Sequence, residues 1–300
     1  MARALITGIA GFTGQHLARE LEGAGHDVVG LTHAGGKTSE RVRACDLCDS
    51  SGLREVVAEF RPDFVVHLAA VAFVAHGDVD AIYRTNVVGT RNLLVALAAQ
   101  PSAPRAVLLA SSANIYGNAD LDVIDESVPP SPANDYAVSK IAMEYMASLW
   151  KSQLPITFVR PFNYTGVGQS LDFLLPKIVD HLKRRAAVIE LGNLDVERDF
   201  SDVRMVVQCY RRLLEAQSLS ARSGDVFNVC SGVGHTLREV LRVGSDIAGH
   251  APDIRVNPAF VRANEVKRLV GSKLALEKLI GPVTPVQLQE TLRWMLHGDV

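Results

Sequence analysis

A tyrosine and a lysine stand four residues apart in the segment Tyr136-Ala137-Val138-Ser139-Lys140. On an α-helix this spacing places both side chains on one face. A phenol has a pKa of about 10, and a neighbouring ammonium group stabilises the phenolate and lowers that pKa. The pair therefore predicts a proton donor or acceptor, although a tyrosine and a lysine at this spacing also occur on solvated helix faces.

A glycine-rich turn near the N-terminus predicts a place for a cofactor. The apolar strand Ala4 to Thr7 leads into Gly8-Ile9-Ala10-Gly11-Phe12-Thr13-Gly14 and then into a helical pattern. The first glycines allow the backbone to approach a pyrophosphate, the last lets the helix pack on the strand, and the helix N-terminus offers N–H groups to the anion. In this context the turn favours dinucleotide binding over a plain tight turn.

The end of the predicted second strand, His26 to Leu31, bears on the choice of cofactor. Thr32 and His33 occupy the place where an acidic residue would bind a ribose 2′-hydroxyl. Three cations follow at Lys37, Arg41 and Arg43. The missing acid and these cations favour NADP(H) over NAD(H), although the same charges also fit a solvated loop.

Strands and helices continue to alternate up to Pro161. Continuous apolar strands are predicted at 64–68 and 106–110, and the second of these delivers Ser111 and Ser112 to its C-terminal end, the edge at which open α/β sheets bind ligands. A helix is predicted over 82–99, interrupted at Gly89. The pattern predicts an α/β fold with a Rossmann-type doubly wound parallel sheet.

Beyond Pro161 the alternation becomes irregular, which indicates a smaller C-terminal α/β substrate lobe. We assign residues 1–162 to the dinucleotide-binding domain, with returning segments at about 203–230. Residues 163–202 and 231–300 form the predicted substrate-binding lobe, closed by an amphipathic helix over 285–296.

Composition narrows the classes of partner. The chain has 300 residues, 48% of them hydrophobic, and a formal net charge of −2 without long runs of like charge. These values favour small-molecule partners over nucleic acid or an anionic membrane surface. Met1 to Arg3 run directly into the first strand without signal-peptide features, and the longest apolar run, 64–75, is too short to span a bilayer. We expect a cytoplasmic protein.

The cysteines do not predict a metal or disulfide site. Cys45 and Cys48 have metal-ligand or redox spacing, but no second nearby pair completes a zinc site, and Cys209 and Cys230 stand alone. Chance spacing is the better interpretation.

Taken together, these motifs resemble the extended short-chain dehydrogenase/reductase family, whose members mostly act on nucleotide-linked sugars. The C-terminal half looks closest to the GDP-4-keto-6-deoxy-D-mannose reductases, and GDP-mannose 4,6-dehydratases share part of the pattern. The resemblance covers nearly the whole chain and is carried by the Gly8/Gly11/Gly14 turn, Asp46-Leu47, His67-Leu68-Ala69-Ala70, Asn86 with Gly89-Thr90-Arg91-Asn92, Ser111-Ser112, Tyr116-Gly117, Tyr136 to Lys140, Arg160-Pro161-Phe162-Asn163, Gly166-Val167-Gly168-Gln169, Leu191-Gly192-Asn193-Leu194-Asp195, Arg198-Asp199-Phe200 and Asn228-Val229-Cys230-Ser231-Gly232.

The resemblance implies a role for each candidate site residue. Tyr136 is the general acid or base, Lys140 binds the nicotinamide ribose and depresses the Tyr136 pKa, and Ser112 hydrogen-bonds the reacting oxygen. No metal is implied. The implied cofactor contacts are Gly8, Gly11, Phe12, Thr13, Gly14, His33, Asp46, Leu47, Leu68, Ala69, Ala70, Asn86, Tyr136 and Lys140. The implied substrate contacts are Asn114, Asn163, Arg198, Arg262 and Glu265.

The implied reaction is the NAD(P)H-dependent reduction of a 4-keto group, most closely that of GDP-4-keto-6-deoxy-D-mannose to GDP-D-rhamnose or its 6-deoxytalose epimer. Dehydratases of the family carry a carboxylate where this chain has Asn114, and an amide cannot exchange a proton at neutral pH. A nucleotide-sugar 4-epimerase with retained NAD stays open, as does a non-catalytic NADP-binding sensor.

The resemblance also implies an assembly. The helices predicted over 82–99 and 136–150 resemble those that pair into a four-helix bundle in dimers of the family. We expect a homodimer, although both helices would equally fit a packing on their own sheet.

Overall fold

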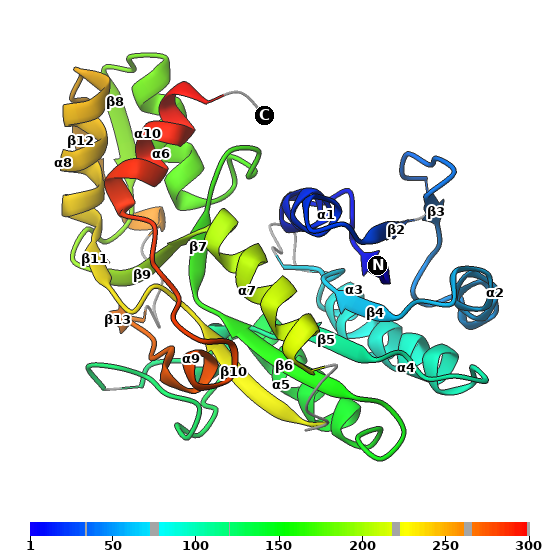
Figure 1. Cartoon of the computed structure of the whole chain (residues 1–300). Coiled ribbons are helices and arrows are strands. Elements are labelled where there is room, and N and C mark those ends of the chain that lie inside the picture. The colour runs from blue at the N-terminus through cyan, green and yellow to red at the C-terminus, as the bar shows by residue number, and fades with distance from the viewer. Residues whose placement is uncertain (34, 73–77, 120, 218–222, 261–265, 299–300) are drawn as a thin grey trace.

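The computed structural model describes residues 1–33, 35–72, 78–119, 121–217, 223–260 and 266–298. Its largest element is a seven-stranded sheet of order β10-β6-β5-β4-β1-β2-β3, in which all neighbours are parallel (Figure 1). The strands are β1 (Arg3–Thr7), β2 (Asp27–Thr32), β3 (Val42–Ala44), β4 (Phe64–His67), β5 (Ala106–Ala110), β6 (Ile156–Pro161) and β10 (Asp225–Val229). The strand order reverses between β1 and β4, so a ligand crevice is expected at their C-terminal ends.

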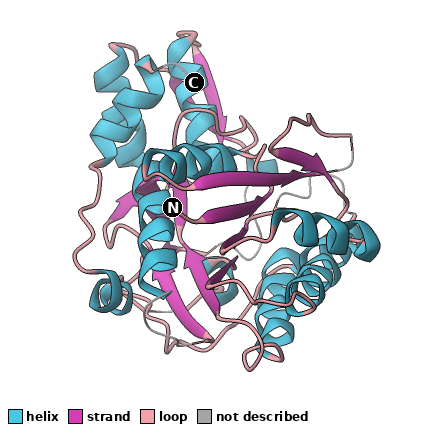
Figure 2. Ribbon diagram, turned by 45° about the vertical axis from the view of Figure 1, so that its right-hand side comes forward, coloured by secondary structure: helices cyan, strands magenta, loops and turns pink. Residues whose placement is uncertain are grey.

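Helices cover both faces of this sheet (Figure 2). One face carries α1 (Phe12–Gly23), α7 (Val203–Gln217) and α9 (Leu274–Ile280), and the other carries α2 (Ser50–Phe60), α4 (Thr90–Ala98) and α5 (Asp135–Ser148). Successive strand residues point to opposite faces. Ile6 of β1 therefore packs with the first group of helices and Leu5 with the second. The predicted doubly wound Rossmann-type fold is confirmed.

The helical segment before β5 differs from the expectation at Gly89. Helix α3 (Val79–Tyr83), the π-helix η1 (Arg84–Gly89) and α4 follow one another without a break, and Gly89 has helical φ and ψ of −59° and −44°. The predicted interruption is therefore wrong. A Cβ at Gly89 would lie 2.7 Å from the Leu47 Cβ, so the glycine permits close packing.

A smaller lobe stands at one end of the large sheet (Figure 1). Its strands are β7 (Asn163–Thr165), β9 (Glu197–Asp202), β11 (Gly234–Thr236) and β13 (Arg268–Leu269), which pair around β9, and β8 (Val188–Leu191) with β12 (Asp253–Val256), which pair with each other. A separate apolar core joins β8 to α6 (Leu174–Lys183), α8 (Leu237–Ala248) and α10 (Leu288–His297). Helix α10 begins at Leu288 after the N-cap residue Gln287, later than the predicted start at Pro285.

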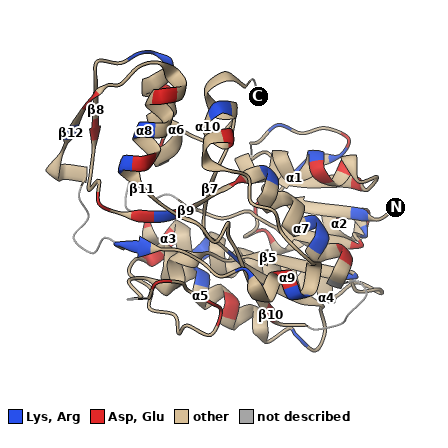
Figure 3. Cartoon of the chain, turned by 60° about the vertical axis from the view of Figure 1, so that its left-hand side comes forward, with Lys and Arg blue, Asp and Glu red and all other residues tan. Residues whose placement is uncertain are grey.

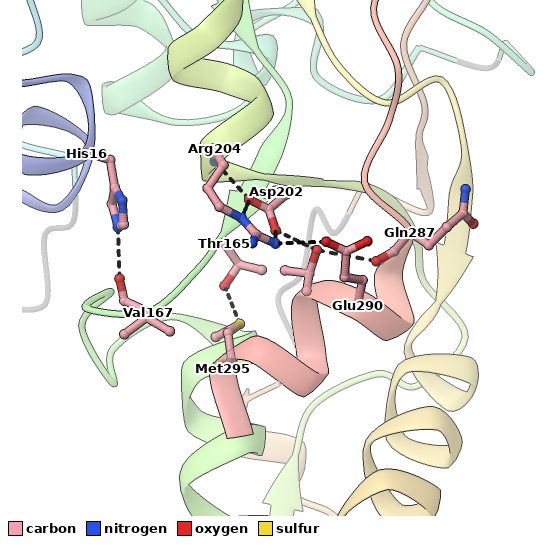
Figure 4. Close-up of polar contacts among 9 residues, drawn as sticks. His16, Thr165, Val167, Asp202, Arg204, Gln287, Glu290 and Met295 are labelled. Carbon is pink, nitrogen blue, oxygen red and sulfur yellow. Dashed lines mark hydrogen bonds and ion pairs between the residues drawn. The ribbon is translucent and has the colours of Figure 1, made fainter. Parts of the chain in front are cut away.

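Polar contacts fix α10 against the strands of the smaller lobe (Figure 4). The buried carboxylate of Asp202 accepts hydrogen bonds from Arg204 Nε (2.9 Å) and from Thr291 Oγ1 on α10 (2.8 Å). Arg204 also faces Glu290 at 3.5 Å.

The predicted division into two domains stays a prediction. Helices α7 and α9 both pack on the large sheet, although α9 belongs to residues 231–300, which we assigned to the substrate-binding lobe.

Charges are dispersed over the surface of the described chain, with lysine and arginine interspersed among acidic residues (Figure 3). No helix in the described part of the chain is both long and apolar enough to cross a membrane. The described residues also contain no group of three or more histidine, cysteine or acidic side chains that could hold a metal ion, and all four cysteines are free thiols.

Candidate active site

Ser112, Tyr136 and Lys140 meet at the C-terminal end of β5. Ser112 lies two residues after the end of β5 and caps the short 3₁₀-helix η2 (Ala113–Tyr116), its Oγ accepting from the Asn114 N–H at 3.2 Å. Helix α5 starts beside it, capped by Asn134, and so carries Tyr136 and Lys140 in its first turns. Lys140 Nζ donates to the carbonyl oxygen of Ala110, the last residue of β5, at 2.8 Å. The structure thus brings the three predicted catalytic side chains together.

Burial dominates the protonation of this group. It raises the pKa of Tyr136 to about 12, with the charge of Tyr164 acting in the same direction and a hydrogen bond with Ser112 acting against it. Burial likewise lowers the pKa of Lys140 to about 8, opposed by the carboxylate of Glu144. Burial thus sets the direction of the Tyr136 pKa shift in the protein alone. Lys140 Nζ lies 5.8 Å from the centre of the Tyr136 ring, and the expected lowering of the Tyr136 pKa by Lys140 stays a prediction.

A buried ion pair stands behind Lys140. Glu144 lies one turn further along α5, and its carboxylate binds Arg160 of β6 through Nε (3.0 Å) and Nη2 (2.7 Å), with each side chain only 7% exposed. Arg160 Nη1 donates to the Tyr116 hydroxyl (2.9 Å), which donates to Asn228 Oδ1 (2.7 Å). This network ties the active-site helix to β6, η2 and β10, and it satisfies the buried charges.

The π-helix η1 holds α5 from the other side. Asn86 Oδ1 accepts from the Val71 N–H at 2.9 Å, and Asn86 Nδ2 donates to Ser139 Oγ at 3.0 Å. Ser139 Oγ in turn donates to the Tyr136 carbonyl at 2.7 Å. Asn86, predicted as a cofactor contact, thus connects the segment after β4 with the backbone of Tyr136.

His67 links the two central strands beneath the crevice. Its Nδ1 lies 2.7 Å from Thr7 Oγ1 at the end of β1, and its Nε2 lies 2.8 Å from Thr90 Oγ1. Thr7 Oγ1 also accepts the N–H of Ala69 at 3.2 Å. Burial, aided by the charge of Lys140, lowers the pKa of His67 to about 3, so the imidazole is neutral at physiological pH.

The glycine turn has the shape that a dinucleotide requires. Gly8 has a φ of +73°, and a Cβ there would lie 3.0 Å from the backbone of Ala69. A Cβ at Gly14 would lie 2.3 Å from the Gly8 oxygen, so helix and turn pack as closely as predicted. Within the described residues no side chain caps the N-terminus of α1, which leaves its first N–H groups for an anion. The residues present therefore fit the implied cofactor.

The residues predicted beside the adenine end of the cofactor follow the C-terminal ends of β2 and β3. His33 and Asp46 are exposed, whereas Leu47 is buried and its carbonyl accepts from Asn92. Of the nearby cations, Arg41 pairs with Asp27 at 3.4 Å and Arg43 with Glu59 at 2.6 Å. Lys37 is exposed and has no ion pair with a described residue. Leu68, Ala69 and Ala70 follow β4 and are partly buried.

The residues predicted to contact the substrate differ in their exposure and in their contacts within the protein. Asn114 and Asn163 are both exposed. Asn114 lies two residues after Ser112, and Asn163 is the first residue of β7. The guanidinium of Arg198 donates to the backbone carbonyls of Val266 and Lys267, so it holds β9 against the segment that enters β13. Its contact with a substrate remains a proposal. Arg262 and Glu265 lie outside the described residues.

Sequence reasoning assigned no role to Glu144 or Tyr164. The sequence contained two signals for the Glu144–Arg160 pair. Glu144 lies four residues after Lys140, and Arg160 lies at the end of an apolar strand. Tyr164 had no such signal, since its hydroxyl meets Thr13, 151 positions away in the chain.

Among curated proteins, several relatives match this chain over most of its length. It is 33% identical to GDP-6-deoxy-D-talose 4-dehydrogenase from Aggregatibacter actinomycetemcomitans over 92% of this chain and 90% of that protein. It is also 33% identical to GDP-6-deoxy-D-mannose reductase from Pseudomonas aeruginosa, over 98% of this chain and 96% of that protein.

Solved structures of similar proteins also match this chain over nearly its whole length. A putative epimerase from Burkholderia cenocepacia J2315 superposes with a TM-score of 0.92 at 51% identity, covering 98% of this chain and 97% of the other. RMD from Pseudomonas aeruginosa, complexed with NADPH, superposes with a TM-score of 0.85 at 32% identity, covering 99% and 98%. The model of the NAD dependent epimerase/dehydratase family matches residues 4–230. The chain belongs to this family, that of the extended short-chain dehydrogenases/reductases, as the motifs predicted.

Proposed function

We propose that the protein reduces the 4-keto group of a nucleotide-linked 6-deoxy sugar with a nicotinamide cofactor. The substrate that we favour is GDP-4-keto-6-deoxy-D-mannose, and the product is GDP-D-rhamnose or its 6-deoxytalose epimer. The names of the two curated relatives support a GDP-linked 6-deoxy sugar. The observation that carries the proposal is the convergence of Ser112, Tyr136 and Lys140 at the C-terminal edge of the large sheet, the edge that also carries the glycine turn.

In the proposed reaction the nicotinamide, when bound, supplies the hydride. Ser112 donates a hydrogen bond to the carbonyl oxygen of the substrate, where negative charge develops. Tyr136 then transfers its hydroxyl proton to that oxygen, which completes the alcohol. Lys140 stabilises the resulting phenolate through its positive charge. Gly8 to Gly14 would hold the pyrophosphate, and Lys140 the ribose.

Asn114 argues against a dehydratase. Elimination of water needs a further group that accepts and returns a proton, and an amide lacks one. The exposed Asn114 amide, next to Ser112, instead offers hydrogen bonds to a sugar hydroxyl.

The cofactor that we propose is NADPH. His33 stands in place of the acid that would bind a ribose 2′-hydroxyl, and Lys37 lies four residues beyond it. RMD, at 32% identity, is complexed with NADPH, which supports the same choice here.

A nucleotide-sugar 4-epimerase is the second candidate, favoured by the 51% identity to the Burkholderia cenocepacia protein, which is described as a putative epimerase. One assay separates the two. The purified protein is mixed with GDP-4-keto-6-deoxy-D-mannose and NADPH, and the absorbance of the reduced nicotinamide is followed. We expect one NADPH oxidised per sugar reduced. Unchanged absorbance, with interconversion of UDP-glucose and UDP-galactose in the absence of added cofactor, would establish the epimerase instead.

We also propose a homodimer formed through α5 and η1. Val138, Tyr145 and Leu149 recur on one side of α5, and Tyr145 and Leu149 are 68% and 78% exposed. Val88 of η1 is exposed as well, and α5 packs against η1. Sedimentation velocity should give a dimer for the native protein and a monomer for Leu149→Arg, whereas Arg242→Glu on α8 should remain dimeric. A native monomer would refute the assembly.

A further inference from the structure

The first turn of α1 is held by a side chain from the smaller lobe. Tyr164 of β7 places its ring on that of Phe12, with centroids 6.1 Å apart and planes 15° from parallel. Its hydroxyl lies 2.8 Å from Thr13 Oγ1. Phe12 and Thr13 are the two residues between Gly11 and Gly14, so Tyr164 contacts the part of the turn proposed to receive the pyrophosphate.

The contact between α1 and this lobe extends one turn further. His16 Nε2 lies 2.9 Å from the carbonyl oxygen of Val167. Figure 4 shows His16 of α1 pointing toward Val167. The His16 ring also meets Phe12 edge-on at 5.3 Å and Trp294 of α10 at 5.8 Å. These contacts fix α1 relative to the residues that follow β7.

Tyr164 also lies near the catalytic tyrosine. The charge of its phenolate would raise the pKa of Tyr136, and burial raises the pKa of Tyr164 itself. Tyr164 is therefore a neutral phenol at physiological pH. It can hold Thr13 through its hydroxyl without adding a charge next to Tyr136.

We propose that Tyr164 is a positioning residue that orients Thr13 and Phe12 for the cofactor and so couples the cofactor turn to strand β7. Asn163, a proposed sugar contact, precedes Tyr164 on the same strand. A shift of β7 on sugar binding would be transmitted to Thr13 through one hydrogen bond and one ring contact. The inference rests on the proposed cofactor site at the glycine turn, but not on the identity of the sugar.

A double-mutant cycle on cofactor binding tests the coupling. NADPH and NADH are titrated into the native protein without sugar, with nicotinamide fluorescence as the readout. We expect Tyr164→Phe, which keeps the ring, to weaken binding about 3- to 10-fold because the Thr13 hydroxyl loses its partner. Tyr164→Phe should then cause no further loss in a Thr13→Val background. Thr13→Ser, which keeps the hydroxyl, should bind nearly as well as the native protein.

Tyr145→Phe, on the exposed side of α5, is the matched control and should bind the cofactor as the native protein does. The inference is overturned if Tyr164→Phe binds both cofactors normally, if the two losses multiply in the double variant, or if the native protein binds neither cofactor. Failure of the keto-sugar assay with an intact binding cycle would reject only the proposed substrate.

Discussion

Lys140 and Glu144 lie buried beside the large sheet, whereas Asn163 lies exposed on the first strand of the smaller sheet. The first region lies against the seven-stranded parallel sheet and is held by the hydrogen bonds of Asn86, Ser139 and Arg160. The second rests on strands of two to six residues around β9. Proton transfer depends on the pKa values of the reacting groups, and burial is the largest cause of the shifts at Tyr136 and Lys140. Recognition of a sugar instead needs polar side chains that are open to solvent until the ligand arrives.

The largest effect should follow from removing the proposed acid. Tyr136→Phe should lower kcat about 10²- to 10⁴-fold, since the reacting oxygen loses its proton donor. Cofactor affinity should change less than about twofold, because the ring remains. Steady-state kinetics and a cofactor titration provide the two measurements, and Tyr145→Phe is the control. Retention of most of the rate would remove Tyr136 from proton transfer.

The next largest effect should come from the buried ion pair. Glu144→Gln leaves the Arg160 charge without its partner and should lower the free energy of unfolding by about 3–5 kcal/mol. The matched control is Asp246→Asn on α8 in the smaller lobe, whose pair with Arg242 has both side chains 67% exposed and should contribute less than about 1 kcal/mol. Urea unfolding measures both. Equal losses would show that burial does not distinguish the two regions.

The buried histidine should make the cofactor side sensitive to acid. The pKa of His67 is about 3 in the folded chain against an ordinary 6.5. Below pH 6.5 His67 therefore binds a proton in the unfolded chain but not in the folded chain, so the free energy of unfolding falls as pH falls. Between pH 7 and 5 this costs about 2 kcal/mol. Urea unfolding at both pH values should show that loss, and His67→Gln should lack it; identical pH dependence in the two proteins would contradict the assignment.

The smallest effect is expected on the exposed side. Asn163→Ala should raise KM for the nucleotide sugar about 3- to 10-fold through the loss of one hydrogen bond. Both kcat and the free energy of unfolding should stay nearly constant, since the side chain is exposed and not part of the proton transfer. A fall in kcat with unchanged KM would move Asn163 from sugar binding to chemistry.

Local sequence signals predicted much of the fold. The apolar strands β4 and β5, the glycine turn and the closing helix α10 follow from periodicity and from residue types a few positions apart. The error at Gly89 has a tertiary cause. A glycine weakens a helix locally, but the close approach of Leu47 leaves no room for a side chain at position 89. No local sequence pattern reports that contact.

By itself, the sequence determined that Tyr136 and Lys140 share a helix face and that a glycine turn joins a strand to a helix, because both depend on spacing along the chain. Only the tertiary structure decided that Lys140 donates to Ala110, that Glu144 binds Arg160, and that Tyr164 contacts the glycine turn. These contacts join residues brought together by strand order. The raised pKa of Tyr136 likewise arises from burial, which no short segment of sequence specifies.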